Sequence, residues 1–150
     1  MSSSNGVANW IPDGYTESVY FEGVDNLHGD LRFTYRPILI TTLARINREM
    51  NDAGDDDTKK QYIAAKWMGQ RLVSWDMKKP NGESVDFRDQ EQMVHVRTVL
   101  FNRLWNCIGQ GIDGGDHDPK KTAQEQYSDS QTDMAVAMRE GSREEVLEGN

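Results

Sequence analysis

The stretch LVSWDMKKPNGESVDFRDQEQMVHVRTVLFNRLWNCI, residues 72–108, contains the strongest structural signals of the chain. In its first half, apolar residues alternate with polar ones over 73–77 and again over 85–87, and a turn at Asn81 and Gly82 lies between the two runs. Two alternating runs on either side of an Asn-Gly turn predict a β-hairpin.

The second half of this stretch predicts one amphipathic helix from Asp89 to residue 108. Asp89, followed three residues later by Gln92, is a variant of the capping box that starts helices, and Gly109 ends the run. Apolar residues recur at helical spacing and predict a buried stripe formed by Met93, Val96, Leu100, Leu104 and Cys107. We therefore expect Cys107 to be a small buried hydrophobic residue rather than a nucleophile.

Upstream, residues 31–35 (LRFTY) place Leu31, Phe33 and Tyr35 on one face of a predicted strand. A further β-prone run covers 19–21, and Pro37 suits the first turn of a helix. The next helix is predicted from Ile38 to about Ala53, because apolar residues recur at helical spacing at Leu39, Leu43, Ile46 and Met50.

A second helix is predicted over 58–73, after three aspartates at 55–57 whose carboxylates can accept its free N–H groups. Two apolar lines run along it, so we expect it to pack on two sides. Together these elements predict a mainly α protein with a small β component. The expected domain has three helices, a central β-hairpin and an N-terminal β-rich segment.

Charge divides the chain of 150 residues into three parts. The net charge is −8, yet residues 18–108 carry 13 acidic and 13 basic side chains, so the whole excess lies at the two ends. We interpret 1–17 as a flexible arm, 18–108 as one domain and 109–150 as an acidic, largely disordered tail. Acidity of this kind keeps a protein in solution.

Composition also excludes several classes of protein. An acidic chain lacks the basic surface of a sequence-independent nucleic-acid binder. No apolar run is long enough to span a membrane, and the N-terminus lacks a signal-peptide pattern. A single cysteine, Cys107, cannot form an intramolecular disulfide, so we expect the protein to be kept in a reducing cytoplasm. Together, these observations lead us to expect no cofactor and no membrane or nucleic-acid partner.

A search for catalytic motifs finds no phosphate loop, dinucleotide fingerprint, HExxH or GxSxG. An enzyme would have to use Asp76, Asp86 and His95, or the pair Glu91 and His95 on one predicted helix, and we favour a non-enzymatic protein. Two acidic clusters, at 52–57 and 113–118, are explained by helix capping and by solvation, with weak divalent-cation binding as the alternative.

Aromatic side chains are the remaining unusual feature. A domain of about 90 residues seldom buries several tryptophans completely, because each is large and its N–H needs a partner. We expect core packing for most of them and an exposed apolar patch that binds a helix or another subunit. The candidates for partner binding are Trp67, Trp75, Phe101 and Trp105, with Trp10 as a short anchor in the N-terminal arm.

Two stretches resemble the small tail proteins of long-tailed bacteriophages, in particular the tail assembly chaperones. They are LRFTYRP at 31–37, which includes Phe33, Tyr35 and Pro37, and the block at 72–108. In the block, the matching residues are Trp75, Asp76, Gly82, Glu83, Val85, Phe87 and the stripe from Met93 to Leu104. The resemblance covers 18–108 and implies a mostly helical, non-enzymatic protein. Such a protein binds the tape-measure protein and brings tail-tube subunits to it.

The sequence is also compatible with functions other than that of a tail assembly chaperone. A permanent component of the virion, such as a tail, connector or baseplate protein, would order its terminal arms on assembly. A chaperone would act in the host cytoplasm, whereas a structural component would remain in the particle. Self-association and a role as a host adaptor are also open.

Overall fold

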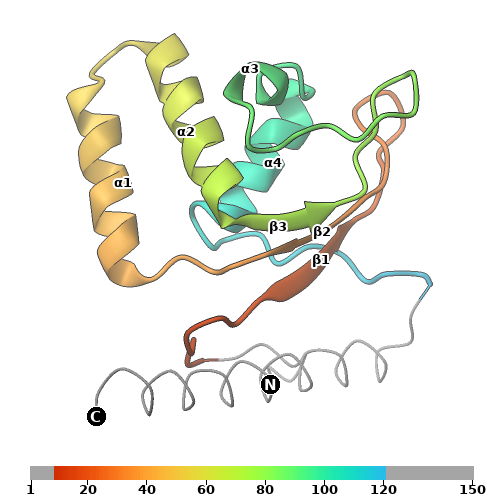
Figure 1. Ribbon diagram of the computed structural model, residues 1–150, viewed down its shortest axis with the longest axis horizontal. Coiled ribbons are helices and arrows are strands. Elements are labelled where there is room, and N and C mark those ends of the chain that lie inside the picture. The colour runs from red at the N-terminus through yellow and green to blue at the C-terminus, as the bar shows by residue number, and fades with distance from the viewer. Residues whose placement is uncertain (1–8, 121–150) are drawn as a thin grey trace.

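A three-stranded antiparallel sheet forms the base of the molecule, and helices cover one of its faces (Figure 1). The computed structural model describes residues 9–120. The strands, in sheet order, are β1 (Glu17–Phe21), β2 (Leu31–Tyr35) and β3 (Leu72–Trp75). The helices are α1 (Ile40–Asp52), α2 (Asp57–Arg71), α3 (Gln90–Met93) and α4 (Thr98–Ile108). Helices combined with a smaller β component match the expected class, although the described residues form four helices rather than three.

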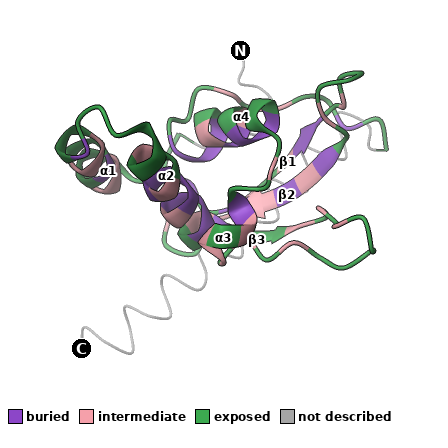
Figure 2. Ribbon diagram, turned by 90° about the horizontal axis from the view of Figure 1, so that it is seen from above, coloured by how far each residue is buried: buried purple, intermediate pink, exposed green. Residues whose placement is uncertain are grey.

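The central strand β2 shows why the sheet has one apolar face. Leu31, Phe33 and Tyr35 are buried, whereas Arg32 and Thr34 lie on the opposite face and are only partly covered (Figure 2). This alternation confirms the predicted strand. β1 pairs with β2 from Glu17 opposite Tyr35 to Phe21 opposite Leu31, which adds the Phe21 ring to the same apolar layer.

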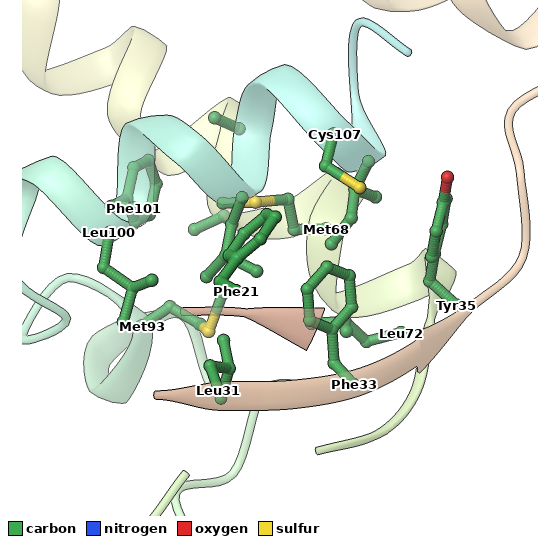
Figure 3. Packing of buried hydrophobic residues seen from close by; sticks show 14 residues of the cluster. Phe21, Leu31, Phe33, Tyr35, Met68, Leu72, Met93, Leu100, Phe101 and Cys107 are labelled. Carbon is green, nitrogen blue, oxygen red and sulfur yellow. The ribbon is translucent and has the colours of Figure 1, made fainter. Parts of the chain in front are cut away.

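The buried face of the sheet packs against α2, α3 and α4 to form the main cluster (Figure 3). Helix α4 contributes Leu100, Leu104 and Cys107, all of which are buried as predicted. α3 contributes Met93, which is buried as predicted, whereas Val96, the next residue of the predicted stripe, is only partly buried. The buried residues of the main cluster are Phe21, Leu31, Phe33, Tyr35, Ala64, Ala65, Met68, Leu72, Met93, Leu100, Phe101, Leu104, Cys107 and Ile108.

Helix α2 packs on two sides, as its two apolar lines predict. One side joins the main cluster, and the other meets α1 in a smaller α1–α2 cluster of Ile46, Ala53, Ile63 and Trp67. The helix begins as expected, because the Asp56 carboxylate accepts the Lys59 backbone N–H at 3.0 Å.

Helix α1 begins at Ile40, two residues later than predicted. Leu39 is extended (φ −79°, ψ 158°) and 46% exposed, so it does not join the apolar stripe. Pro37 precedes the helix instead of lying in its first turn, and its carbonyl accepts the Arg71 guanidinium at 3.3 Å. Contact with the end of α2 therefore keeps this connection extended.

The predicted hairpin over 73–87 is confirmed only near its turn, where residues 77–79 and 83–85 pair antiparallel. The Asn81–Gly82 turn is present, with Gly82 at φ +89° and the Lys79 N–H donated to the Glu83 carbonyl. However, the strand before the turn, β3, pairs with β2, because this pairing buries Leu72 in the main cluster. The chain after the turn pairs with the chain before it through the Lys78–Ser84 bridge and the Val85 N–H, which donates to the Met77 carbonyl at 3.1 Å, and then crosses α2.

This crossing depends on a glycine. A Cβ on Gly69 would lie 2.5 Å from the Phe87 carbonyl oxygen, so only glycine allows the returning chain to lie directly on α2. The Phe87 ring packs edge-on against Trp75, with the ring centroids 5.5 Å apart.

The predicted single helix over 89–108 is also wrong, because it is broken into α3 and α4. Arg97 is extended (φ −54°, ψ 137°), and the β-branched Val94 and Val96 in the break are poor helix formers. Asp89 caps α3 as predicted and accepts the Glu91 N–H at 3.0 Å. The Gln92 side-chain oxygen accepts the Asp86 N–H, which departs from a capping box.

Both expected domain boundaries lie inside the folded region. Tyr15 is buried, and β1 begins at Glu17, within the segment that we expected to be a flexible arm. At the other end, residues 113–118 belong to the folded region, because Asp116 bonds to the edge of β1 and the acidic side chains pair with Arg103 on α4 and Arg32 on β2. The parts of these predictions that concern residues 1–8 and 121–150 lie outside the described residues.

Candidate functional site

Trp67 belongs to the interior of the protein and not to a binding groove. Its side chain is 6% exposed in the α1–α2 cluster, and its indole N–H donates to the Glu49 carboxylate at 3.0 Å. Arg45 and Lys66 lie over its ring. The prediction that Trp67 contacts a partner is therefore wrong, because α1 already covers it.

Trp75 and Trp105 are half-buried and hold neighbouring chain segments in place. The Trp75 indole N–H donates to the Val85 carbonyl at 2.8 Å, which fixes the segment that returns from the turn. The Trp105 ring lies against Gly109, where a Cβ would be 2.3 Å from the nearest ring atom. Trp105 also contacts both clusters.

Trp10 is the most exposed of the tryptophans, with 75% of its surface accessible. It precedes β1, whereas Trp67 lies on α2, Trp75 ends β3 and Trp105 lies on α4. The five aromatic candidates are thus distributed over several elements, and two of them, Trp67 and Phe101, are buried.

The best candidate surface includes Phe101. Phe101 is only 4% exposed, yet it contributes to the wall of an open hollow of about 370 Å³ between α2 and the α3–α4 junction. The lining residues are Thr58, Gln61, Tyr62, Val94, Val96, Thr98 and Phe101. The helix break creates this hollow, because it brings Val94 and Val96 opposite the first turns of α2.

The polar lining residues are Thr58, Gln61, Tyr62 and Thr98, and Tyr62 forms a hydrogen-bonded pair with Glu91 beside the hollow. The Tyr62 hydroxyl donates to the Glu91 carboxylate, with both oxygens at 3.3 Å. The negative charge of Glu91 raises the pKa of the Tyr62 hydroxyl above its ordinary value. The hollow therefore has a mixed lining, with apolar side chains at Val94, Val96 and Phe101 and the Glu91 carboxylate beside it, an arrangement that suits an apolar side chain next to a cationic one.

Of the three residues considered for catalysis, Asp76 and Asp86 lie in the connection between β3 and α3, and His95 lies between α3 and α4. Asp76 accepts the Arg32 backbone N–H at 2.9 Å, and Asp86 accepts the Arg88 N–H at 3.0 Å, so both carboxylates stabilise backbone. His95 is exposed in the break between α3 and α4. Because of this break, Glu91 and His95 do not share one helix face, as the pair considered above would require.

Cys107 is buried beside a small polar cluster at the edge of the main cluster. The thiol is 1% exposed, and burial raises its pKa to about 12. Nearby, the Tyr35 hydroxyl donates to the Glu17 carboxylate at 3.2 Å, and burial raises the pKa of both groups. At neutral pH the thiol is therefore protonated, whereas a cysteine nucleophile needs a thiolate.

The acidic clusters differ in their roles. Asp56 caps α2 as expected, but the aspartates at 113, 116 and 118 form ion pairs, so the prediction that solvation explains them is wrong. Within residues 9–120, no group of three or more His, Cys, Asp or Glu side chains could hold a metal ion. In the same range, no helix has the length and apolar character needed to cross a membrane.

Comparison with known proteins adds no relative. No family model, curated protein or solved structure that was compared with this chain matches it. Function must therefore be inferred from the chain's own residues and surfaces.

Proposed function

We propose that this protein is a non-enzymatic tail assembly chaperone of a bacteriophage. It binds helical segments of the tape-measure protein, keeps that protein soluble in the host cytoplasm, and helps to recruit tail-tube subunits. The observation that carries this proposal is the hollow between α2 and the α3–α4 junction, whose lining includes the exposed side chain of Val94.

The hollow fits the side chains of an amphipathic helix. Val94 on its wall is 39% exposed, and Val99 in the first turn of α4 is 45% exposed, so apolar surface faces water on and beside it. A partner helix that places apolar residues at i, i+3, i+4 and i+7 would cover such a surface. Glu91, held by Tyr62, offers a negative charge to a lysine or arginine of that helix.

The kind of partner follows from the resemblance over 18–108 to tail assembly chaperones. A tape-measure protein is long and rich in amphipathic helices, and such helices aggregate when their apolar faces are uncovered. The proposed surface uses Tyr62, Val94, Val96 and Phe101; of these, only Phe101 was among the partner-binding candidates suggested by the sequence.

Co-expression tests this proposal. The tape-measure protein of the same phage is expected to be soluble when it is produced together with the full chain, and insoluble alone. Val94→Asp places a charge on the wall of the hollow and should abolish this rescue. Val24→Asp is the matched control, because Val24 lies in the β1–β2 loop with a similar exposure of 45%.

The outcomes separate the candidate functions. A tape-measure protein that stays insoluble with the wild-type chain contradicts the chaperone function, and equal rescue by both variants contradicts the surface. Mass spectrometry of purified virions tests the alternative of a permanent component. Abundant protein in mature particles would favour that alternative.

A further inference from the structure

Strand β1 lies at an edge of the sheet, where unpaired backbone groups can bind another strand. Its even-numbered residues direct their backbone groups away from β2. The Tyr20 carbonyl and the Glu22 N–H both bond to Asp116 on this side. Because N–H and C=O groups alternate along a strand, Ser18 also directs its backbone groups to this edge.

The C-terminal strap, residues 113–118, occupies this edge. The Asp116 N–H donates to the Tyr20 carbonyl at 2.7 Å, and the Asp116 carboxylate accepts the Glu22 N–H at 2.8 Å. Among the described residues, the strap forms only one bridge with β1, at Tyr20. It covers the edge without becoming a fourth strand.

Ion pairs attach the strap to the domain. Arg103 on α4 binds Asp113 at 2.9 Å and Asp116 at 3.0 Å. Arg32 on β2 binds the two carboxylate oxygens of Asp118 at 2.8 and 2.9 Å. The Glu22 N–H and Arg103 hold the pKa of Asp116 below its ordinary value, so this carboxylate stays ionised at neutral pH.

The strap also fits closely against β1. Gly115 adopts φ +84°, and a Cβ on it would lie 2.4 Å from a methyl group of Val19. Apart from Gly115, the attachment uses mostly charged and backbone groups. Its strength therefore depends on the strap carboxylates, of which Asp118 is the most buried, with its side chain 10% exposed.

We propose that the C-terminal strap guards the edge of β1, and that release of the strap allows this edge to pair with β1 of a second copy of the chain. Among the described residues no strand or helix follows the strap, so it can leave β1 without separating any of these elements. This device is independent of the proposed chaperone function.

A second copy is the occupant that β1 itself suits. In an antiparallel pair centred on Val19, Ser18 faces Tyr20 of the other copy and Glu17 faces Phe21. No like charges then face each other across the new pair, and both exposed edges are covered at once. The two sheets would join into one continuous sheet.

Sedimentation of the full chain tests the proposal. The double variant Asp116→Ala/Asp118→Ala removes two strap carboxylates, and Gly115→Ala displaces the strap without changing any charge. Faster hydrogen exchange at the Glu22 amide, with circular dichroism unchanged, shows that the strap has left a folded domain. For both variants we expect an apparent mass approaching twice that of wild type at high protein concentration.

A second change locates the interface. Ser18→Pro in the released background removes an edge N–H and should restore the wild-type mass, whereas Ser18→Ala removes only the hydroxyl and should not. Release of the strap without any rise in mass would overturn the proposal. Association that survives Ser18→Pro in the folded protein would also overturn it, because another surface would then be responsible.

Discussion

The main cluster and the α1–α2 cluster differ in how they are enclosed. Three strands and three helices surround the main cluster, whereas only two helices form the other, with four buried residues. Polar contacts support the smaller one, where Glu49 accepts both Lys66 at 2.6 Å and the Trp67 indole. Helix α1 is therefore docked on the domain, while α2 and α4 are part of its interior.

This difference teaches that an amphipathic pattern does not reveal how firmly a helix is held. Both α1 and α4 present apolar residues at helical spacing, yet Ile46 is the only buried residue of α1 and five residues of α4 are buried. We expect the main cluster to determine global stability and α1 to detach in a local opening.

The largest expected effect is that of Leu104→Ala in the main cluster. Leu104 is fully buried, and truncating its side chain leaves a cavity that lowers the free energy of unfolding by about 2–5 kcal/mol. Urea unfolding followed by circular dichroism should show one cooperative transition at a lower midpoint. If Leu104→Ala lowered the free energy of unfolding less than Ile46→Ala does, the main cluster would not be the one that determines global stability.

Ile46→Ala should cost less, although Ile46 is just as deeply buried. Once α1 has detached, no further stability can be lost, so the cost cannot exceed the free energy of docking. We expect a loss of at most about 2 kcal/mol, the low end for large-to-small changes in a core. Hydrogen exchange should accelerate strongly in α1 and little in α4, and equal acceleration would show that the two clusters unfold together.

The two clusters also contain glutamates that should respond to pH in opposite directions. Beside the main cluster, burial raises the pKa of Glu17 above 4.5. Because the folded protein binds the Glu17 proton more tightly than the unfolded chain does, this group contributes most to stability below pH 4.5. The contribution is lost as pH rises through the raised pKa. Glu17→Gln keeps an acceptor for Tyr35 and should stabilise the protein at neutral pH. Urea unfolding between pH 4.5 and 8 checks this, with Glu22→Gln as an exposed control.

The smallest effect is expected from Glu49→Gln in the α1–α2 cluster. The Lys66 ammonium lowers the pKa of Glu49 below 4.5, so its contribution is present above that value and is lost as pH falls through the lowered pKa. The pair is partly exposed, and we expect a cost below about 1 kcal/mol. The difference in free energy of unfolding between Glu49→Gln and wild type should shrink at low pH. A difference that grows there would contradict a lowered pKa of Glu49.

Local periodicity predicted much of this fold. The strand at 31–35, the two-sided helix α2, its aspartate cap and the buried residues of α4 all follow from which side chains recur on one face. These features depend on neighbours in sequence, because a period of two or of 3.6 residues already separates an apolar side from a polar one.

Pairing over long distances could not be predicted in the same way. The turn at Gly82 is real, but β3 pairs with β2 because Leu72 gains burial against residues far away in sequence. The aspartates of the C-terminal strap look solvated when read locally. Only the fold brings Arg103 and Arg32 to them.

The candidate site was predicted least well. Aromatic composition indicated a binding surface, but it cannot distinguish Trp67, whose N–H finds Glu49 inside the protein, from Trp10, which remains exposed. The hollow depends on the break between α3 and α4. The valines at 94 and 96 were a signal for this break, because β-branched residues weaken helices.

The sequence by itself determined the buried face of β2, the two-sided packing of α2 and the buried residues of α4, because these depend on local periodicity. It also determined that the charge excess lies at the two ends of the chain. Only the tertiary structure decided which strand pairs with β3, how tightly each helix is held and what the acidic residues 113–118 bind. These outcomes depend on groups distant in sequence, whose free energy of interaction exists only once the chain has brought them together.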